Sequence, residues 1–262
     1  MNQSHQDSTI TRERFDAVLF DLDGVLTDTT RVHAACWKKM FDRFLRNWAD
    51  SRGEEFRPFS IKEDYFLYVD GRLRSDGVRD FLKSRNINLP EGGPDAPPES
   101  ETISGLGNRK NDMVNAFMES EGIDVYSDSV AWVRMLREQG YKTAVVSAST
   151  NCQTVLNSAE ILDLFDTIVD GTVAADLDLA GKPLPDTFLN AAEKLGVEPK
   201  RVVVVEDAIS GVQAGRSGGF GLVIGVARKE NAQALKENGA DIVVENFNKF
   251  LHRRDAKGAE KT

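Results

Sequence analysis

One stretch near the N-terminus, FDAVLFDLDGVLTDT at residues 15–29, constrains the fold more than any other part of the chain. Within this stretch, the apolar run AVLF at residues 17–20 is followed directly by two close carboxylates, Asp21 and Asp23. A short apolar run of this kind predicts a strand that is buried on both faces of a parallel sheet, and ligands bind where such strands end. Like charges held close together oppose ionisation, so the pair indicates a bound cation or a reaction that uses both groups. The alternative is that the two residues only start a turn, because Asp-Gly favours turns.

The second half of the chain alternates between strand and helix patterns. Alternating elements predict a parallel sheet that is covered by helices on both faces, so the predicted fold class is α/β, with a doubly wound, Rossmann-like core. The expected strands are 143–147, 167–169, 202–205, 222–224 and 242–244, and the expected helices are 127–139, 151–160, 186–195, 208–217 and 232–237.

An insert separates the first strand from this alternating half. Beyond residue 50 it is rich in Arg, Lys, Phe and Tyr, and it lacks a Val/Ile run long enough for a central strand. The predicted organisation is a catalytic core at residues 1–28 and 122–262 and an inserted α-helical cap at residues 29–121. Within the cap we expect a mobile surface loop at 88–104, which carries four prolines and two adjacent glycines, and helices at 31–50, 61–68, 78–85 and 108–120.

Composition narrows the function classes. The formal net charge of -9 argues against non-specific nucleic-acid binding, which depends on basic patches. No apolar run approaches the roughly 20 residues of a membrane span, and the polar N-terminus has no signal-peptide segment. The only cysteines, Cys36 and Cys152, form no spaced metal pattern and lie in predicted helices. We therefore expect reduced thiols and a cytoplasmic protein, with loosely ordered ends before residue 15 and after residue 251.

Polar residues also follow other predicted strands. Ser147 ends the strand TAVVS, Glu206 and Asp207 follow VVVV, and Lys182 lies in the loop AGKPLPD. Because parallel strands end at one edge of the sheet, we expect these groups to converge with the first acidic pair. The carboxylates would suit Mg²⁺, while Ser147 and Lys182 offer donors and one positive charge to phosphate oxygens. Each also has a plainer interpretation: a strand-end serine, acidic residues that start a helix, and a solvated lysine.

With magnesium in place, Asp21 can attack phosphorus as a nucleophile and form an aspartyl-phosphate. Asp23, two residues later, can pass a proton to or from the reacting oxygen. Positioning and charge neutralisation are most of what phosphoryl transfer requires, so the sequence predicts a phosphotransferase site.

The order of these motifs resembles that of the haloacid dehalogenase superfamily of aspartate-nucleophile phosphotransferases. Within it, the chain resembles the β-phosphoglucomutases over residues 15–244, through the segments DLDGVLTDT, VVSASTN, GKPLPDTFLNAA and VEDAISGVQAG. The resemblance implies that Asp21 is the nucleophile and a Mg²⁺ ligand, and that Asp23 is the general acid/base and a ligand through its carbonyl. It implies the following further roles: Glu206 and Asp207 in the magnesium site; Ser147, Ala148 and Lys182 on the phosphate with Asn151 nearby; Thr29 as hinge; and His33 and Trp37 towards substrate.

A mutase also needs a second anion site, because its bisphosphate intermediate must turn over and bind again. The cap segments GRLR at 71–74 and RKND at 109–112 resemble those that grip sugar phosphate in β-phosphoglucomutases, and we assign this role to Arg74 and Lys110. The plainer interpretation is that these cations are solvated. The stretch at 47–59 and the proline-rich loop depart from the family pattern.

The resulting hypothesis is a monomeric, Mg²⁺-dependent β-phosphoglucomutase. It would interconvert β-glucose 1-phosphate and glucose 6-phosphate through an aspartyl-phosphate and glucose 1,6-bisphosphate. Two alternatives stay open on the sequence. One is a phosphatase of small phosphorylated sugars. The other is a phospho-accepting receiver module, which also gathers acidic residues, a Ser or Thr and a Lys around Mg²⁺.

Overall fold

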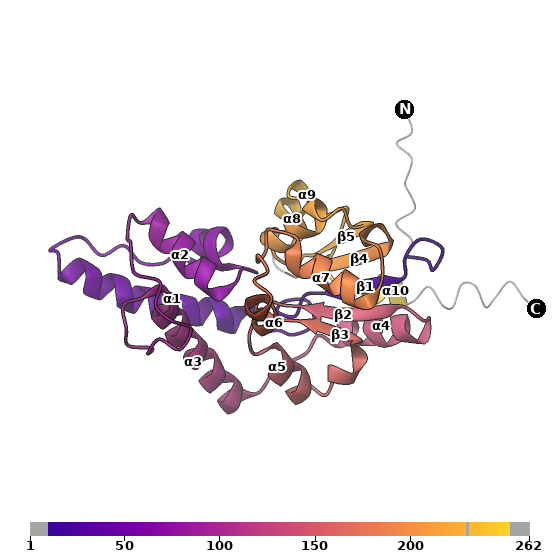
Figure 1. Cartoon of the computed structure of the whole chain (residues 1–262), viewed down its shortest axis with the longest axis horizontal. Coiled ribbons are helices and arrows are strands. Elements are labelled where there is room, and N and C mark those ends of the chain that lie inside the picture. The colour runs from indigo at the N-terminus through magenta and orange to yellow at the C-terminus, as the bar shows by residue number, and fades with distance from the viewer. Residues whose placement is uncertain (1–9, 229–230, 252–262) are drawn as a thin grey trace, which may run out of the picture. The chain divides into compact units, whose positions relative to one another are not determined.

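The computed structural model of the chain describes residues 10–228 and 231–251 (Figure 1). It divides into two compact units, which we call the core and the cap. The core takes the chain up to Leu26 and from Val125 onward, and the cap is Thr27–Asp124. The sequence-based boundaries, after residue 28 and after residue 121, differ from these by two and three residues. The expected loose tail at residues 252–262 and most of the expected N-terminal lead-in lie outside the described residues.

The core is built on a six-stranded parallel sheet with the order β3-β2-β1-β4-β5-β6 (Figure 1). Its central strand β1 pairs with β2 on one side and with β4 on the other. The strand order reverses between β1 and β4, which is the place where doubly wound sheets open a ligand crevice. The predicted α/β fold class is therefore confirmed. The strands are β1 Ala17–Phe20, β2 Lys142–Val146, β3 Thr167–Val169, β4 Val202–Glu206, β5 Leu222–Val226 and β6 Ile242–Val244.

Helices cover both faces of this sheet. The face that carries Leu19 packs against Phe188 and Ala191 of α7, and all three are fully buried. On the other face, Phe20 meets the ring of Trp132 in α4 edge-on, with ring centroids 5.5 Å apart. The core helices are α4 Ser127–Glu138, α5 Cys152–Ser158, α6 Gly171–Asp176, α7 Asp186–Leu195, α8 Ile209–Ser217, α9 Ala232–Glu237 and α10 Asn248–Leu251, with 3₁₀ turns at Leu162–Leu164 and Pro199–Arg201.

The differences from the predicted core elements are small. Strand β2 ends at Val146, one residue before the prediction, and β4 runs on through Glu206. The short helices α6 and α10 and the 3₁₀ turns were not predicted. Among the described residues, no helix is both long and apolar enough to cross a membrane.

The cap is helical, as predicted. It comprises α1 Thr30–Asp50, a π-helix Ile61–Val69, α2 Arg74–Ser84 and α3 Ile103–Glu121. An aromatic cluster holds these elements together: the ring centroid of Phe41 lies 5.3 Å from that of Trp37, 5.1 Å from Phe59 and 4.3 Å from Phe81. The predicted starts of α2 and α3 were wrong, because both helices begin about one turn earlier in the chain.

The loop between α2 and α3, residues 85–102, is called the proline loop below. We expected a mobile surface segment, yet hydrogen bonds tie this loop to both neighbouring helices. Arg79 of α2 donates to the Glu91 carboxylate at 2.9 Å. Asn108 donates to the carbonyls of Pro94 and Ala96, each at 2.9 Å, and Arg109 donates to that of Pro98 at 2.6 Å. Residues 103 and 104, which we had placed in the loop, belong to the first turn of α3.

Candidate active site

The ends of β1 and β4 place three acidic side chains together. Phe20 pairs with Val205, so Asp21 follows β1 beside Glu206, the last residue of β4, and its amide donates to the Val205 carbonyl at 2.9 Å. Carboxylate oxygens of Asp21, Glu206 and Asp207 all lie within 4.8 Å of one another, and all three residues are buried. The predicted convergence of the strand ends therefore holds for these three residues.

Lys182 projects between two of these carboxylates. Its Nζ lies 2.5 Å from Asp21 Oδ1 and 2.5 Å from Glu206 Oε1, and it also donates to the Val146 carbonyl at 3.1 Å. The side chain is only 2% exposed, so the solvated-lysine interpretation is wrong. Because Val146 is the last residue of β2, the same ammonium also connects the acidic cluster to the strand that ends next to Ser147.

Burial dominates the electrostatics of this cluster. It raises the pKa of Asp21 well above its ordinary value and raises that of Glu206 as well. Burial alone would lower the pKa of Lys182, but the attraction of Asp21 and Glu206 outweighs it, and the net direction is upward. The ammonium therefore stays charged and contacts two of the three carboxyl groups in the cluster.

The charge balance of the cluster fits a hard divalent cation. Glu206 Oε1 is buried and touches the ammonium as an ion pair, but it accepts no aligned hydrogen bond. Carboxylates packed this closely in a buried site are costly unless a cation compensates them. Oxygen ligands in this number are what Mg²⁺ takes in proteins, usually together with water.

Asp23 stands at the turn after β1. It is half-buried, and its charge contributes to the raised pKa of Asp21. Gly24, the next residue, has φ of 85°, a backbone conformation that suits glycine and bends the chain directly after Asp23. The turn therefore keeps a second, more accessible carboxyl group beside Asp21.

The segment after β2 forms a tight turn around Ser147. This residue is 2% exposed, and its hydroxyl accepts a hydrogen bond from the Ser149 amide at 3.1 Å. Ser149 in turn accepts one from the amide of Asn151 at 3.2 Å, directly before α5. Ala148 lies inside this turn. Ser147 thus lies at the same edge of the sheet as the acidic cluster. Its neighbour Val146 accepts a hydrogen bond from Lys182, which contacts Asp21 and Glu206.

Three of the predicted substrate residues gather inside the cap. Lys110 Nζ lies 3.0 Å from His33 Nδ1 and 5.1 Å from the centre of the Trp37 ring, and Lys110 is 5% exposed. Arg74, the first residue of α2, donates to Asn108 Oδ1 at 3.3 Å, and burial lowers its pKa. Arg74 therefore contacts α3 at Asn108, which is two residues before Lys110.

The predicted hinge residue lies at the junction of the two units. Thr29 directly precedes α1, and its hydroxyl is hydrogen-bonded to that of Thr27 at 2.9 Å. One participant was missed by the sequence reasoning: Gly211 of α8 lies against the Glu206 carboxyl group. This residue is visible in the sequence as the glycine of the segment VEDAISG, five residues after Glu206.

Known proteins share this architecture. A family model described as haloacid dehalogenase-like hydrolase matches residues 15–219. A β-phosphoglucomutase from Mycobacterium bovis is 46% identical over 91% of this chain and 92% of its own length. A phosphorylated carbohydrates phosphatase from Thermotoga maritima is 25% identical over 87% of this chain and 94% of its own. A solved β-phosphoglucomutase from Clostridium difficile has a TM-score of 0.70 and 25% identity, over 93% of this chain and 96% of that one.

The matched motifs, the sheet order and the acidic strand ends agree with one another. The family match also removes the receiver-module alternative. The chain is an enzyme that belongs to the haloacid dehalogenase-like hydrolase family and resembles its β-phosphoglucomutases.

Proposed function

We propose that this protein is a Mg²⁺-dependent β-phosphoglucomutase that interconverts β-glucose 1-phosphate and glucose 6-phosphate. The observation that carries the proposal is the buried cluster of Asp21, Glu206, Asp207 and Lys182 at the point where the strand order reverses. The 46% identity to a β-phosphoglucomutase over nearly the whole chain supports the choice of reaction.

In this proposal Asp21 is the nucleophile. Its carboxyl group is held by the Lys182 ammonium, which fixes its orientation and favours the ionised form that attacks phosphorus, against the burial that raises its pKa. The oxygens of Asp21, Glu206 and Asp207, with the carbonyl of Asp23, would hold Mg²⁺, which would supply charge neutralisation to the phosphate when bound. When the donor is glucose 1,6-bisphosphate, the attack breaks one of its phosphate ester bonds and leaves a phosphorylated Asp21 and a glucose monophosphate with a free hydroxyl group.

Asp23 handles the proton of that hydroxyl. A half-buried carboxyl group two residues from the nucleophile can donate to the leaving oxygen and later accept from the attacking one. Ser147 and Ala148 would hold the transferring phosphate with Lys182, and Asn151 lies at the end of the same turn. These groups provide the positioning that phosphoryl transfer requires.

The cap supplies what a mutase needs beyond a phosphatase. Lys110 and Arg74 would bind the second phosphate of glucose 1,6-bisphosphate while the intermediate turns over, and His33 and Trp37 would contact the sugar. A movement at Thr29 would open and close the site. We further propose that the enzyme acts as a monomer on small phosphorylated sugars.

A coupled assay tests the proposal. β-Glucose 1-phosphate with a trace of glucose 1,6-bisphosphate should yield glucose 6-phosphate in a Mg²⁺-dependent way, while inorganic phosphate is monitored in parallel. Asp21→Asn should abolish turnover and retain the fold, whereas Asp163→Asn, an exposed aspartate of the core, should leave turnover unchanged. Appreciable turnover by purified Asp21→Asn would refute the nucleophile assignment.

The second candidate is a sugar-phosphate phosphatase. The Thermotoga maritima relative, whose name describes that activity, favours it. Release of inorganic phosphate without any glucose 6-phosphate would decide for the phosphatase.

A further inference from the structure

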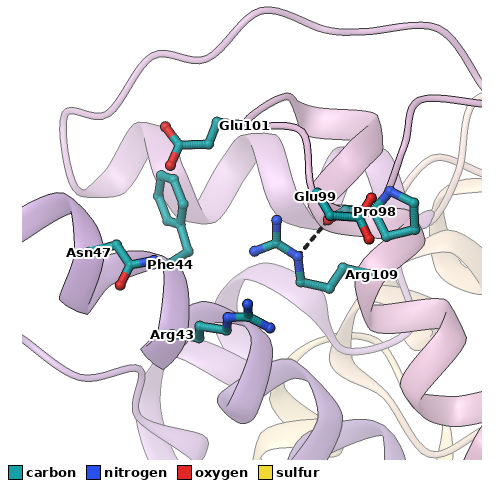
Figure 2. A pocket seen from close by; sticks show the side chains of 7 residues that line it. All are labelled: Arg43, Phe44, Asn47, Pro98, Glu99, Glu101 and Arg109. Atoms are coloured by element: carbon teal, nitrogen blue, oxygen red, sulfur yellow. Dashed lines mark hydrogen bonds between the residues drawn. The ribbon is translucent and has the colours of Figure 1, made fainter.

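The proline loop forms part of the wall of an open cavity that lies wholly within the cap. The cavity measures about 210 Å³, and helix α1, the proline loop and helix α3 all contribute to its wall (Figure 2). No role in the proposed reaction accounts for it. The lining residues are Arg43, Phe44, Asn47, Pro98, Glu99, Glu101 and Arg109.

This cavity is separate from the cluster that we assign to substrate. Arg109 and Lys110 are consecutive, but neighbouring residues of an α-helix point about 100° apart. Lys110 reaches His33, while Arg109 lines the cavity. His33 and Arg43 are ten positions apart along α1, which corresponds to about 15 Å of helix.

Two guanidinium groups face this cavity (Figure 2). Nε of Arg109 donates to the Pro98 carbonyl at 2.6 Å, which aims its terminal nitrogens and leaves them available. Within residues 10–228 and 231–251, the guanidinium of Arg43 makes no hydrogen bond or ion pair. Burial and the charge of Arg43 lower the pKa of Arg109, while the charges of Glu99 and Glu101 raise it. The two guanidinium groups therefore repel each other and the carboxylates offset this only in part, so an anion held between the guanidinium groups would reduce the repulsion further.

The remaining wall defines the kind of anion. Guanidinium groups bind phosphate through paired hydrogen bonds. Glu99 and Glu101 would accept hydrogen bonds from hydroxyl groups and repel any second negative charge. The cavity is smaller than the roughly 300–1,000 Å³ of ordinary ligand pockets, so its occupant is small.

We propose that this cavity is a second, non-catalytic binding site for a small phosphate monoester that carries free hydroxyl groups. The phosphate lies between Arg43 and Arg109, and the hydroxyl groups face Glu99 and Glu101. The occupant thereby joins the proline loop to α1 and α3, which gives this loop a function. The proposal concerns binding only, so it does not depend on which reaction the core catalyses.

Calorimetric titration of the full-length protein with glycerol 3-phosphate tests this proposal. Glycerol 3-phosphate should bind saturably and more tightly than inorganic phosphate, and glycerol alone should not bind. Arg43→Gln should weaken the binding at least tenfold, because it removes half of the charged donors. Lys39→Gln is the matched control: it makes the same charge change on the same helix at an exposed position outside the cavity, and binding should stay within twofold.

The carboxylates provide an independent check of the ligand class. In the double variant Glu99→Gln, Glu101→Gln, inorganic phosphate should bind more tightly, and the advantage of glycerol 3-phosphate should shrink. Equal dissociation constants for Arg43→Gln and Lys39→Gln would overturn the site. Equal affinity of the unsubstituted protein for inorganic phosphate and glycerol 3-phosphate would overturn the ligand class. Melting temperatures of all variants confirm that each has folded.

Discussion

Gly211 provides a sharp test of how the acidic cluster is packed. A Cβ atom at this position would lie 1.9 Å from Glu206 Cδ and 2.0 Å from Oε1, far inside any real contact. Gly211→Ala must therefore displace the Glu206 carboxyl group. That group is fully buried and ion-paired with Lys182 at 2.5 Å, so it has no solvent to move into and loses its partner when it moves.

Two opposing effects determine the stability of this variant. Alanine is favoured over glycine inside a helix by about 1 kcal/mol, which would stabilise α8. Forcing an extra methyl group into a packed core costs about 1–3 kcal/mol, and breaking a buried ion pair costs about 3–5 kcal/mol. Even partial disruption of the pair outweighs the helix gain, so we expect the free energy of unfolding to fall by about 2 kcal/mol or more.

Urea denaturation, monitored by circular dichroism, measures this change in the free energy of unfolding. Gly215→Ala is the control. Gly215 lies one turn further along α8, where a Cβ would meet Val223 at 3.0 Å, away from the carboxylates. Gly211→Ala should also raise the Mg²⁺ concentration needed for half-maximal turnover, whereas Gly215→Ala should not. A Gly211→Ala protein as stable as the parent, or more stable, would refute the reasoning, because helix propensity would then have prevailed over the packing of Glu206.

Three further outcomes follow from the charges and the burial. Lys182→Met should lower the free energy of unfolding by about 3–5 kcal/mol in urea denaturation, because it leaves buried carboxylates unpaired; a loss below about 1 kcal/mol would contradict this. Cys36 and Cys152 are buried and burial raises the pKa of both thiols, so a disulfide reagent at pH 8 should label neither in the folded protein and both in urea; rapid native labelling of either would oppose this. Arg79 lowers the pKa of Glu91, so their pair stabilises the fold above the ordinary glutamate pKa and loses this contribution as pH falls through the lowered value. Glu91→Gln should remove that part of the pH dependence of thermal melting, by less than about 1 kcal/mol because the pair is exposed, and an unchanged profile would count against the pair.

The apolar strands of the core were predictable from the sequence because each is a short run that must be buried on both faces. The bounds of β1, β3, β6, α7 and α9 agree with the prediction, and the other predicted strands and helices of the core differ by one or two residues at one or both ends. The helix starts in the cap were not predictable. Gly77 and Gly105 lie near the starts of α2 and α3, where a Cβ would be 3.1 Å from Val69 and 2.2 Å from Ser100. Close packing leaves no room for a side chain at Gly105 and very little at Gly77, and this is a tertiary requirement that no local pattern shows.

The sequence by itself determined which chemistry the core can support, because parallel strands bring their carboxyl ends, and hence Asp21, Glu206 and Asp207, to one edge. Only the tertiary structure decided how these groups are balanced. Lys182 reaches Asp21 from 161 residues away, through a loop whose path no local pattern specifies. In the cap, likewise, Arg109 and Lys110 point about 100° apart on α3 because they are consecutive helix residues. Only the tertiary structure decided that Arg109 lines the cavity and that Lys110 contacts His33.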